Sequence, residues 1–258
     1  MSFIRFLCNS VTGAALLTLA ACASTDPDAG FAAQDPFEST NRTIHSFNVG
    51  VDRYVLRPVA QGYDTVTPAT FQHMIGNGLS HLQLPVDMAN HFLQGQTMAG
   101  LRTMGRITLN TVLGMGGLLD PATEFGLPRE ETDFGITLGR WGVDQGAFLM
   151  IPLIGPSTPR DIGGFVVDLA FSPTTYFGIS GSDTLNTLSI PLNVVDRVDT
   201  RNRNADLIDE LLYESDDSYV TVRSIYLQRR AAQVAGGDVT DALPDIFEEE
   251  EATPAPAN

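Results

Sequence analysis

Three polar residues at a spacing of four, Arg102, Arg106 and Asn110, are the most suggestive chemical feature of this 258-residue chain. Residues four apart share one face of a helix, so the two guanidinium groups and the amide form a polar strip. The surrounding segment from Met98 to Leu119 is apolar on more than one face, which is typical of a helix with lipid or protein on most sides. The strip indicates either a polar cavity beside this helix or the ordinary surface strip of a core helix.

Motifs for catalysis and metal binding are incomplete. Gly178–Ser182 lacks the final glycine of a nucleophile elbow, and Leu119 stands where a dinucleotide fingerprint starting at Gly114 needs its third glycine. The four histidines (His45, His73, His81 and His91) form no closely spaced pair, and no cysteine beyond Cys22 completes a zinc site. The sequence therefore predicts no enzyme, no metal site and no cofactor.

Cys22 follows Leu19-Ala20-Ala21 at the end of a segment with the features of a secretory signal. Arg5 precedes an apolar run of about a dozen residues, which is too short to cross a bilayer. The motif resembles a bacterial lipobox, in which the cysteine is acylated and begins the mature chain. Because Ala23 rather than aspartate follows, we expect an outer-membrane lipid anchor on the periplasmic side. The alternative is an ordinary secretory signal in which Cys22 is incidental.

The charge balance limits the partners of the chain. It has 31 acidic against 15 basic residues, a net charge of −16, and all of the basic residues are arginine. Nucleic-acid-binding proteins need a cationic face, so nucleic acid is excluded as a partner. Electrostatic docking on anionic headgroups is disfavoured for the same reason, so any membrane contact must be apolar or covalent.

The elements that must position these residues are mostly helices. Helix-start signals occur at Asp35-Pro36, Thr67-Pro68 and Thr158-Pro159, each followed by apolar residues at helical spacing. A further apolar stripe runs from Pro85 to Leu93 and stops before Gly95. Strand alternation is scarce, with 148–154 as the best short candidate.

Composition divides the chain into four parts. Residues 1–21 form the signal and residues 22–34 a lipidated flexible tether rich in small and polar residues. Residues 35–235 form one mostly helical domain without a repeat or linker. Residues 236–258 form an acidic, disordered tail, which is either a partner-binding arm or simply solvated.

Several short strings of residues along the predicted domain carry a resemblance to a known family. They include Asp35-Pro36-Phe37-Glu38, Asn41-Arg42, Arg57-Pro58-Val59-Ala60, Leu93-Gln94-Gly95, Asn110-Thr111, Leu113-Gly114-Met115-Gly116-Gly117, Thr137-Leu138-Gly139, Trp141-Gly142-Val143, Arg160-Asp161 and Gln228-Arg229-Arg230. Over about 200 residues the chain resembles the MlaA (VacJ) family of outer-membrane lipoproteins.

The resemblance implies a ring of amphipathic helices embedded in one leaflet around a polar channel. It implies that mislocalised phospholipid leaves the outer leaflet through this channel and passes to a periplasmic lipid-binding shuttle protein, which maintains lipid asymmetry. It further implies association with a trimeric outer-membrane porin. The alternative is a structural, porin-binding scaffold without transport of its own, and a periplasmic hydrolase is disfavoured by the missing catalytic sets.

The resemblance also suggests roles for single residues. Arg42, Arg102 and Arg106 are candidate contacts of the lipid phosphate, with Asn110 beside them in the channel, because the guanidinium fork matches phosphate oxygens. The competing view is that these arginines cap helix ends or pair with aspartates, namely Asp120, Asp133 and Asp161. Glycines in the 139–146 stretch, at Gly139, Gly142 and Gly146, resemble the family's gating hairpin, although glycine serves ordinary tight turns equally well.

Overall fold

The computed structural model describes residues 35–175 and 183–236, without the side chains of residues 183–191. Cys22, the signal, the tether, the string at 178–182 and the acidic tail beyond Gly236 lie outside these residues. The predicted lipid anchor and the predicted limits at both ends of the chain therefore stay predictions.

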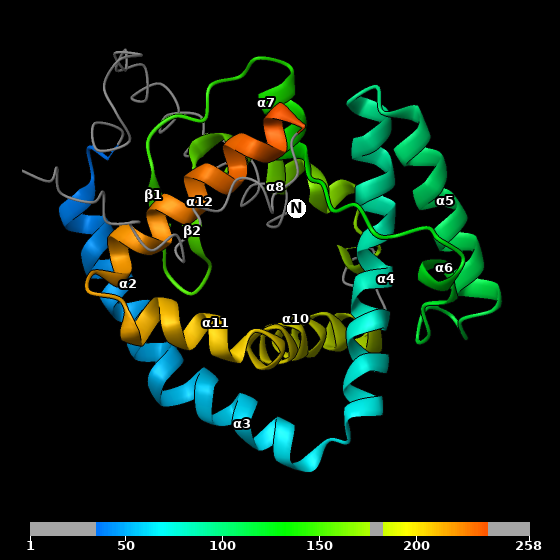
Figure 1. Cartoon of the computed structure of the whole chain (residues 1–258), viewed down its shortest axis with the longest axis horizontal. Helices are drawn as coiled ribbons and strands as arrows, with labels where there is room; N and C mark the ends of the chain where they lie inside the picture. Colours follow the sequence, from blue (N-terminus) through cyan, green and yellow to red (C-terminus); the bar gives the residue numbers. More distant parts are fainter. Residues whose placement is uncertain (1–34, 176–182, 237–258) are drawn as a thin grey trace, which may run out of the picture.

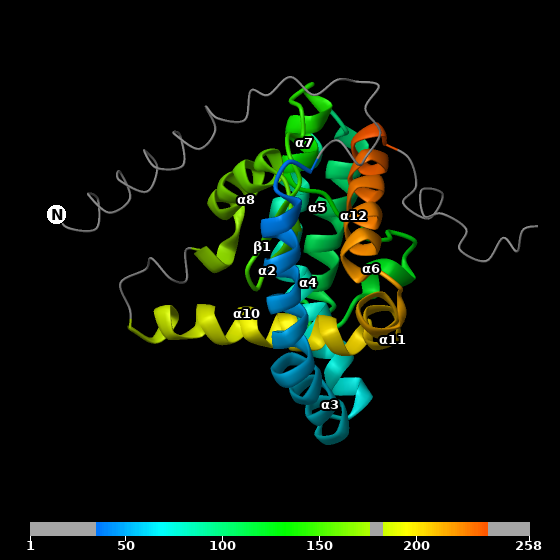
Figure 2. The ribbon, with the colours of Figure 1, turned by 90° about the vertical axis from the view of Figure 1, so that its left-hand side faces the viewer.

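Helices make up most of the described chain, which confirms the predicted mostly α fold. The elements in chain order are α2 (Glu38–Val51), the π-helical η3 (Asp52–Leu56), α3 (Arg57–Val66), α4 (Ala69–Leu93), α5 (Thr97–Val112), α6 (Pro121–Glu124), α7 (Phe134–Arg140), β1 (Leu149–Ile151), β2 (Gly155–Ser157), α8 (Pro159–Phe171), α10 (Asp183–Arg203), α11 (Ala205–Asp209), the π-helical η4 (Glu210–Glu214) and α12 (Ser218–Ala235). Figure 1 shows them arranged as a ring, with α2 opposite α4, α3 along the lower side leading into α4, and α12 opposite α10 and α11. From the side, α2, α4, α5 and α12 run roughly parallel while α10 lies across them (Figure 2). Within the described ranges, no helix has both the length and the hydropathy needed to cross a membrane.

Asp35 holds two other elements rather than capping a helix. The prediction of an N-cap at Asp35 is wrong, since α2 begins at Glu38. The Asp35 carboxylate instead accepts hydrogen bonds from Asn41 Nδ2, at 2.8 Å, and from the Tyr219 hydroxyl. The Asp35 carboxylate thus binds a buried hydroxyl on α12, whereas the local sequence predicts that it accepts from a backbone amide at the start of α2.

Helix α4 joins two stretches that the sequence presents as separate apolar stripes. It begins directly after Thr67-Pro68, as predicted, and continues through Pro85 to Leu93. Proline removes one backbone hydrogen bond inside a helix. Leu84 and Val86 on either side are buried, and their packing holds the helix continuous. Gly95 then adopts a φ of +74°, as predicted for a C-cap glycine.

Helix α5 turns its polar face toward the protein. Thr103, Arg106 and Asn110 are buried, whereas Leu101 and Met104 are among its exposed side chains. Figure 1 shows α5 on the outer side of α4, away from the centre of the ring. Arg106 and Asn110 of the predicted polar strip face inward and the apolar surface faces outward, whereas Arg102 of the same strip is exposed. The helix is also shorter than predicted, because the glycine-rich turn after Val112 ends it.

The apolar core is small. One cluster, made of Phe148, Met150, Tyr219 and Leu227, joins the β1–β2 hairpin region to α12. Other buried apolar side chains, such as Leu84 and Ile136, lie outside this cluster. The hairpin pairs Leu149 with Ser157 and confirms part of the predicted strand. Among the described residues, buried polar and charged side chains outnumber buried hydrophobic ones. Polar pairing therefore holds much of this ring together.

A buried charge cluster joins the early and late parts of the ring. Arg201 on α10 donates to both carboxylate oxygens of Asp52 at 2.9 and 3.1 Å, and the Tyr213 hydroxyl donates to Asp52 at 2.6 Å. Asp209 accepts from both Arg57 and Arg201. Asp52 lies in η3 and Tyr213 in η4, so the two π-helical segments meet at this seam.

Candidate functional site

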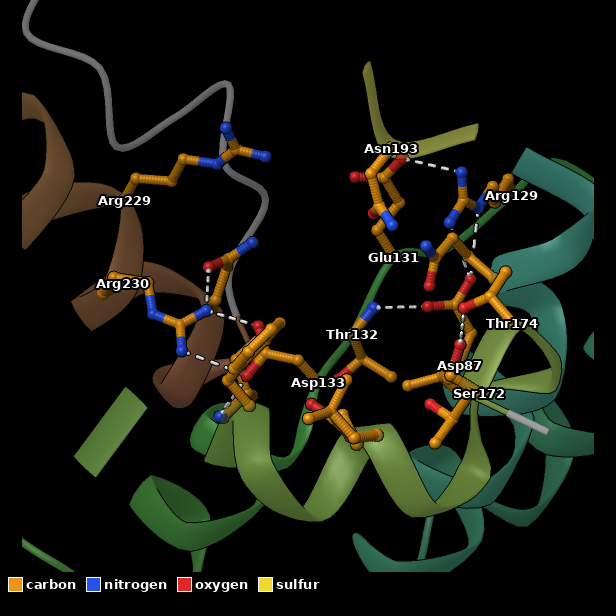
Figure 3. Close-up of a pocket in the computed structure, with 18 of the residues that line it drawn as sticks. Asp87, Arg129, Glu131, Thr132, Asp133, Ser172, Thr174, Asn193, Arg229 and Arg230 are labelled. Atoms are coloured by element: carbon orange, nitrogen blue, oxygen red, sulfur yellow. Dashed lines mark hydrogen bonds and ion pairs between the residues drawn. The ribbon is translucent and has the colours of Figure 1, made fainter. Parts of the chain in front are cut away.

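A cavity of about 730 Å³ lies among α4, α7, α8, α10, α12 and the segment 129–133. Its lining includes apolar side chains such as Val86, Phe165 and Leu169, but charged groups predominate among the larger polar ones. These are the acids Asp87, Glu131, Asp133 and Asp168 and the arginines Arg129, Arg229 and Arg230. Figure 3 shows Arg229 and Arg230 on one side of the cavity and Arg129 with Asp87 on the other. The arrangement can receive a ligand with both charged and apolar parts.

Arg129 and Asp87 form one charged wall of the cavity. The two side chains are 3.1 Å apart, and Arg129 also pairs with Glu131 at 3.1 Å. Asp87 accepts a further hydrogen bond from the Thr132 amide at 3.3 Å. Burial raises the pKa of Asp87 in spite of the neighbouring guanidinium. The positive charge of Arg129 is therefore already committed to two carboxylates.

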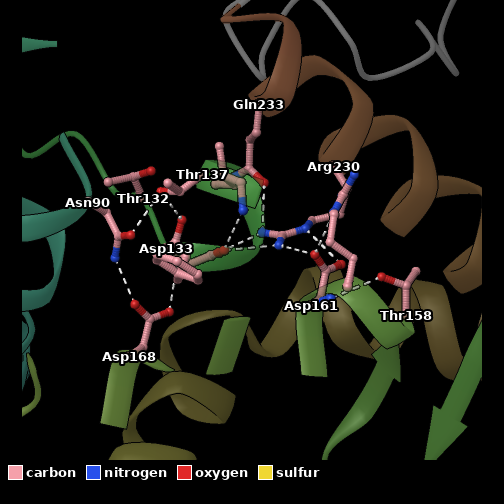
Figure 4. Close-up of polar contacts among 12 residues, drawn as sticks. Asn90, Thr132, Asp133, Thr137, Thr158, Asp161, Asp168, Arg230 and Gln233 are labelled. Carbon is pink, nitrogen blue, oxygen red and sulfur yellow. Dashed lines mark hydrogen bonds and ion pairs between the residues drawn. The ribbon is translucent and has the colours of Figure 1, made fainter. Parts of the chain in front are cut away.

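Arg230 forms the centre of the opposite wall (Figure 4). It donates to Asp133 at 2.6 and 3.0 Å and to Asp161 at 2.5 and 3.1 Å. Asp161 also accepts from the Tyr226 hydroxyl. Burial alone would lower the pKa of Arg230, but the hydrogen bonds and charges of the two aspartates raise it well above its ordinary value. Burial alone would raise the pKa of Asp161, and Arg230 holds it below the usual value instead.

The two aspartates that bind Arg230 lie at helix starts, and one of them is itself a cap. Asp133 accepts from the Ile136 amide at 2.9 Å and caps α7. Thr158 caps α8 by accepting from the Asp161 amide at 3.3 Å, as predicted from the sequence. Arg230 thus ties α12 to the first turns of two helices, and its role in this wall is structural.

Asp168 on α8 lacks a cationic partner among the described residues. One carboxylate oxygen accepts from Asn90 Nδ2 at 2.7 Å and the other from the Phe134 amide at 2.9 Å. Burial, together with the negative charges of Asp133 and Asp87, raises the pKa of Asp168 to about 6. It is a half-buried carboxylate that faces the cavity and is held by neutral donors only.

Arg229 is the matching cation. It lines the cavity from α12, its side chain is exposed, and it makes no ion pair or hydrogen bond with any residue of the described chain. Figure 3 shows its guanidinium group apart from the hydrogen-bonded clusters. Of the three arginines in the lining, it is the one that keeps its charge available for a ligand.

The arginines selected from the sequence lie away from this cavity, and each is paired. Arg42 bridges Glu38 and Asp217 at 2.8 and 2.9 Å and stacks over the Tyr219 ring. Arg102 is exposed and pairs with Glu130 at 3.2 Å. None of the candidates Arg42, Arg102, Arg106 and Asn110 is part of the lining.

Arg106 and Asn110 converge on one partly exposed carboxylate, that of Asp120. Both oxygens of Asp120 accept from Arg106, at 2.9 and 3.0 Å, and Asn110 Nδ2 donates to Asp120 at 2.8 Å. Arg106 also donates to Thr123 and to the Leu127 carbonyl. This pairing with Asp120 is the alternative that the sequence left open, and it fixes the 120–127 segment against α5. A role in phosphate binding stays a prediction for these residues.

The three predicted hinge glycines occupy different settings. Gly139 lies within α7, where an added Cβ would come within 2.6 Å of Val234 and 2.9 Å of Arg160. Gly142 and Gly146 follow the helix with φ values of +89° and +74°. The stretch is thus the end of α7 and a loop, and the hairpin is formed by the next residues, β1 and β2. Its gating role stays a prediction.

Sequence reasoning named Asp133 as a possible arginine partner and missed the other charged residues of the cavity, although a signal for the tandem arginines was present. Neighbours in a helix point about 100° apart, so Arg229 and Arg230 are expected to differ in burial. The tandem contains one exposed and one buried cation, and Arg230 is the buried one. Nothing in the sequence around Asp168 indicates that no arginine would approach it.

Comparison with known proteins gives consistent matches across the chain. A family model described as MlaA lipoprotein matches residues 33–233. The Escherichia coli (strain K12) protein named "Intermembrane phospholipid transport system lipoprotein MlaA" is 35% identical over 229 residues, covering 86% of each chain. The protein of the same name from Haemophilus influenzae is 33% identical over 217 residues, 82% of this chain and 84% of the relative. A solved structure described as "Structural basis for maintenance of bacterial outer membrane lipid asymmetry" aligns with a TM-score of 0.68 and 37% identity, covering 78% of this chain and 98% of that one.

Proposed function

Because the chain belongs to the MlaA lipoprotein family, we propose that it extracts mislocalised phospholipids from the outer leaflet of the outer membrane and passes them through a polar channel to a periplasmic carrier. The charged cavity inside the helical ring carries this proposal. A headgroup that leaves one leaflet for another compartment must pass hydrocarbon, and polar groups along its path lower that barrier.

The outward apolar faces support a position in one leaflet. Leu101 and Met104 on α5 and Phe125 after α6 are exposed large hydrophobic residues outside the cavity lining. Helices that present such faces can lie in the plane of a membrane without crossing it. The proposed channel then opens between the lipid leaflet and the periplasm.

We propose that Cys22 carries the acyl anchor on the periplasmic side of the outer membrane. One acyl chain alone binds membranes only marginally, and several chains hold a protein stably. A Cys22→Ser chain is expected to leave the membrane fraction after a carbonate wash. Retention of that variant in the membrane would reject the anchor.

The partners in this proposal are phospholipid, a trimeric porin and a periplasmic lipid-binding shuttle protein. A strain that lacks the chain is expected to accumulate phospholipid in the outer leaflet, and the wild-type chain is expected to restore the normal level. An unchanged level would favour the second candidate, a porin-binding scaffold. Phospholipid hydrolysis by the purified protein would instead reveal an enzyme.

The gating role of the loop after α7 has a matched pair of variants. An added Cβ at Gly142 meets no atom within 4 Å, so Gly142→Ala acts through the positive φ of that residue, whereas Gly139 and Gly146 have neighbours close to the added atom. Gly163 in α8 also has free space and has an ordinary helical φ, so Gly163→Ala is the control. We expect impaired transport at unchanged protein level for Gly142→Ala only. Equal transport by both variants would reject the hinge.

The earlier phosphate candidates are tested with the same assay. If Arg42, Arg102 or Arg106 contacts the passing phosphate, alanine at that position raises outer-leaflet phospholipid at a normal protein level. The ion pairs of all three favour a structural role instead. Unchanged lipid levels in Arg102→Ala and in folded Arg106→Ala would reject the assignment.

A further inference from the structure

The cavity contains one cation and one anion without an ionic partner among the described residues, and they lie on different helices. Arg229 on α12 has no partner, and Asp168 on α8 has only neutral donors. The remaining charged groups of the lining are engaged: Arg129 with Asp87 and Glu131, and Arg230 with Asp133 and Asp161. A ligand that enters the cavity therefore meets one available charge of each sign.

The carboxylate of Asp168 has the capacity to bind a further donor. A carboxylate has about four lone-pair positions, and Asp168 uses one on each oxygen. The direction of its Asn90 partner is fixed, because the amide oxygen of Asn90 accepts from the Thr137 hydroxyl at 2.8 Å. Figure 4 shows Asn90 between Thr137 and Asp168. Asp168 is thus held in place with lone pairs left over.

The energetics of an unpaired carboxylate favour a cationic ligand. Burial and the nearby charges of Asp87 and Asp133 disfavour its ionised form, which is why its pKa is about 6. A ligand ammonium beside it relieves this cost and forms a charge-assisted hydrogen bond. A second arginine would satisfy the site permanently, so the absence of one near Asp168 in the described chain keeps the position open.

Resting on the proposed function, we propose that the cavity selects phospholipids with a primary ammonium headgroup, with Asp168 binding the ammonium and Arg229 binding the phosphate. A zwitterionic headgroup satisfies both free charges, whereas an anionic headgroup with a neutral alcohol satisfies Arg229 alone. The selectivity therefore belongs to Asp168, and Arg229 supplies affinity that both lipid classes share.

The test is competitive lipid binding by the full-length protein in detergent, read by native mass spectrometry. The probes are dioleoyl phosphatidylethanolamine and dioleoyl phosphatidylglycerol at equal concentration. We expect the ethanolamine lipid to bind about tenfold more tightly, from one charge-assisted hydrogen bond. Asp168→Asn is expected to bring the ratio to about one and to retain binding of the glycerol lipid. Arg229→Gln is expected to weaken both lipids equally at an unchanged ratio.

A matched control and a variant-free measurement separate recognition from folding. Asp206 is exposed on α11 and outside the cavity, so Asp206→Asn makes the same charge change and is expected to leave the ratio unchanged. In the wild-type protein the ratio is expected to rise between pH 5 and pH 7.5 as Asp168 ionises. The charged groups around it, Asp87 on α4 and Asp133 ahead of α7, are each held by an arginine.

The outcomes distinguish this inference from the proposed function. A wild-type ratio near one, or a ratio that Asp168→Asn and pH leave unchanged, overturns the headgroup selectivity while lipid binding still supports transport. Equal weakening of both lipids by Asp168→Asn assigns Asp168 to structure and also overturns it. Binding of neither lipid by the wild-type protein overturns both proposals.

Discussion

The α5 flank and the wall of the cavity are both rich in arginine, and they use it in opposite ways. On the flank, Arg106 is buried with a side-chain exposure of 5%, paired with Asp120, while apolar side chains cover the outside. On the cavity wall, Arg230 is paired in the same manner, but its neighbour Arg229 projects into open space. The α5 flank buries Arg106 and exposes apolar side chains, whereas the cavity wall exposes one of its charges.

This difference shows what decides the role of an arginine. The residue type and its position on a helix face are similar in both regions, and the deciding factor is whether another element places a carboxylate beside the guanidinium group. Asp120 lies in the turn before α6, and Asp133 and Asp161 lie at the starts of α7 and α8. Where no carboxylate lies beside it, as at Arg229, the guanidinium group remains available for a ligand.

The largest expected effect comes from removing the paired arginine of the wall. Arg230→Ala leaves Asp133 without its counter-ion, leaves the buried Asp161 with Arg160 alone, and unties α12 from the starts of α7 and α8. Loss of one partner from a buried pair costs about 4 kcal/mol of unfolding free energy. The urea midpoint of the full-length protein in detergent measures it. The control Arg229→Ala is expected to leave the midpoint unchanged, and equal midpoints for the two variants would show that the tandem arginines are not distinct.

On the α5 flank, the same contrast between a buried and an exposed arginine exists between Arg106 and Arg102. Arg106→Ala removes the hydrogen bonds that hold Asp120, Thr123 and the Leu127 carbonyl, and we expect a loss of about 3 kcal/mol. Arg102 lies one turn earlier, is exposed, and pairs with an exposed Glu130. Such a surface pair contributes roughly 0–1 kcal/mol, so Arg102→Ala is the matched control. A similar loss for both variants would contradict the buried and exposed assignments.

The outward surface of α5 tests the other half of the comparison. Leu101 and Met104 are exposed, so glutamine at both positions is expected to leave the urea midpoint unchanged. If this face lies in lipid, the double substitution weakens partition into vesicles by about 2 kcal/mol, because two apolar side chains no longer enter the bilayer. The measurement is made with Cys22→Ser protein, so that acyl chains do not mask the change. Unchanged partition would place the membrane contact elsewhere.

Much of the architecture could be predicted from the sequence. Periodicity and proline signals place the starts of α4 and α8, and the Gly95 cap follows from residue type, because these are local properties of the chain. The role of Asp35 could not be predicted, since its partner Tyr219 lies 184 residues away. The unpaired charges of the cavity could not be predicted for the same reason. A charge is unpaired because no residue from another element contacts it, and sequence spacing does not reveal contacts between distant elements.

The smallest expected effect is a pH dependence of stability that belongs to Asp168. Its pKa in the folded protein, about 6, lies above the ordinary value of 3.8. A raised pKa contributes stability that is fully present below the unfolded value and is lost as pH rises through the folded value. Because Asp168 is only half-buried, we expect a loss on the order of 1 kcal/mol between pH 4 and pH 7. The aspartates whose pKa is lowered, such as Asp161, act in the opposite direction below their ordinary value.

The Asp168→Asn variant isolates that contribution. The substitution also disturbs the hydrogen bonds to Asn90 and the Phe134 amide, but this offset does not change with pH. The informative quantity is therefore the slope: the urea midpoint of the wild-type protein is expected to fall relative to that of the variant as pH rises from 4 to 7. A constant difference would mean that Asp168 has a cationic partner in the folded protein, and the cavity wall would then use its charges as the α5 flank does.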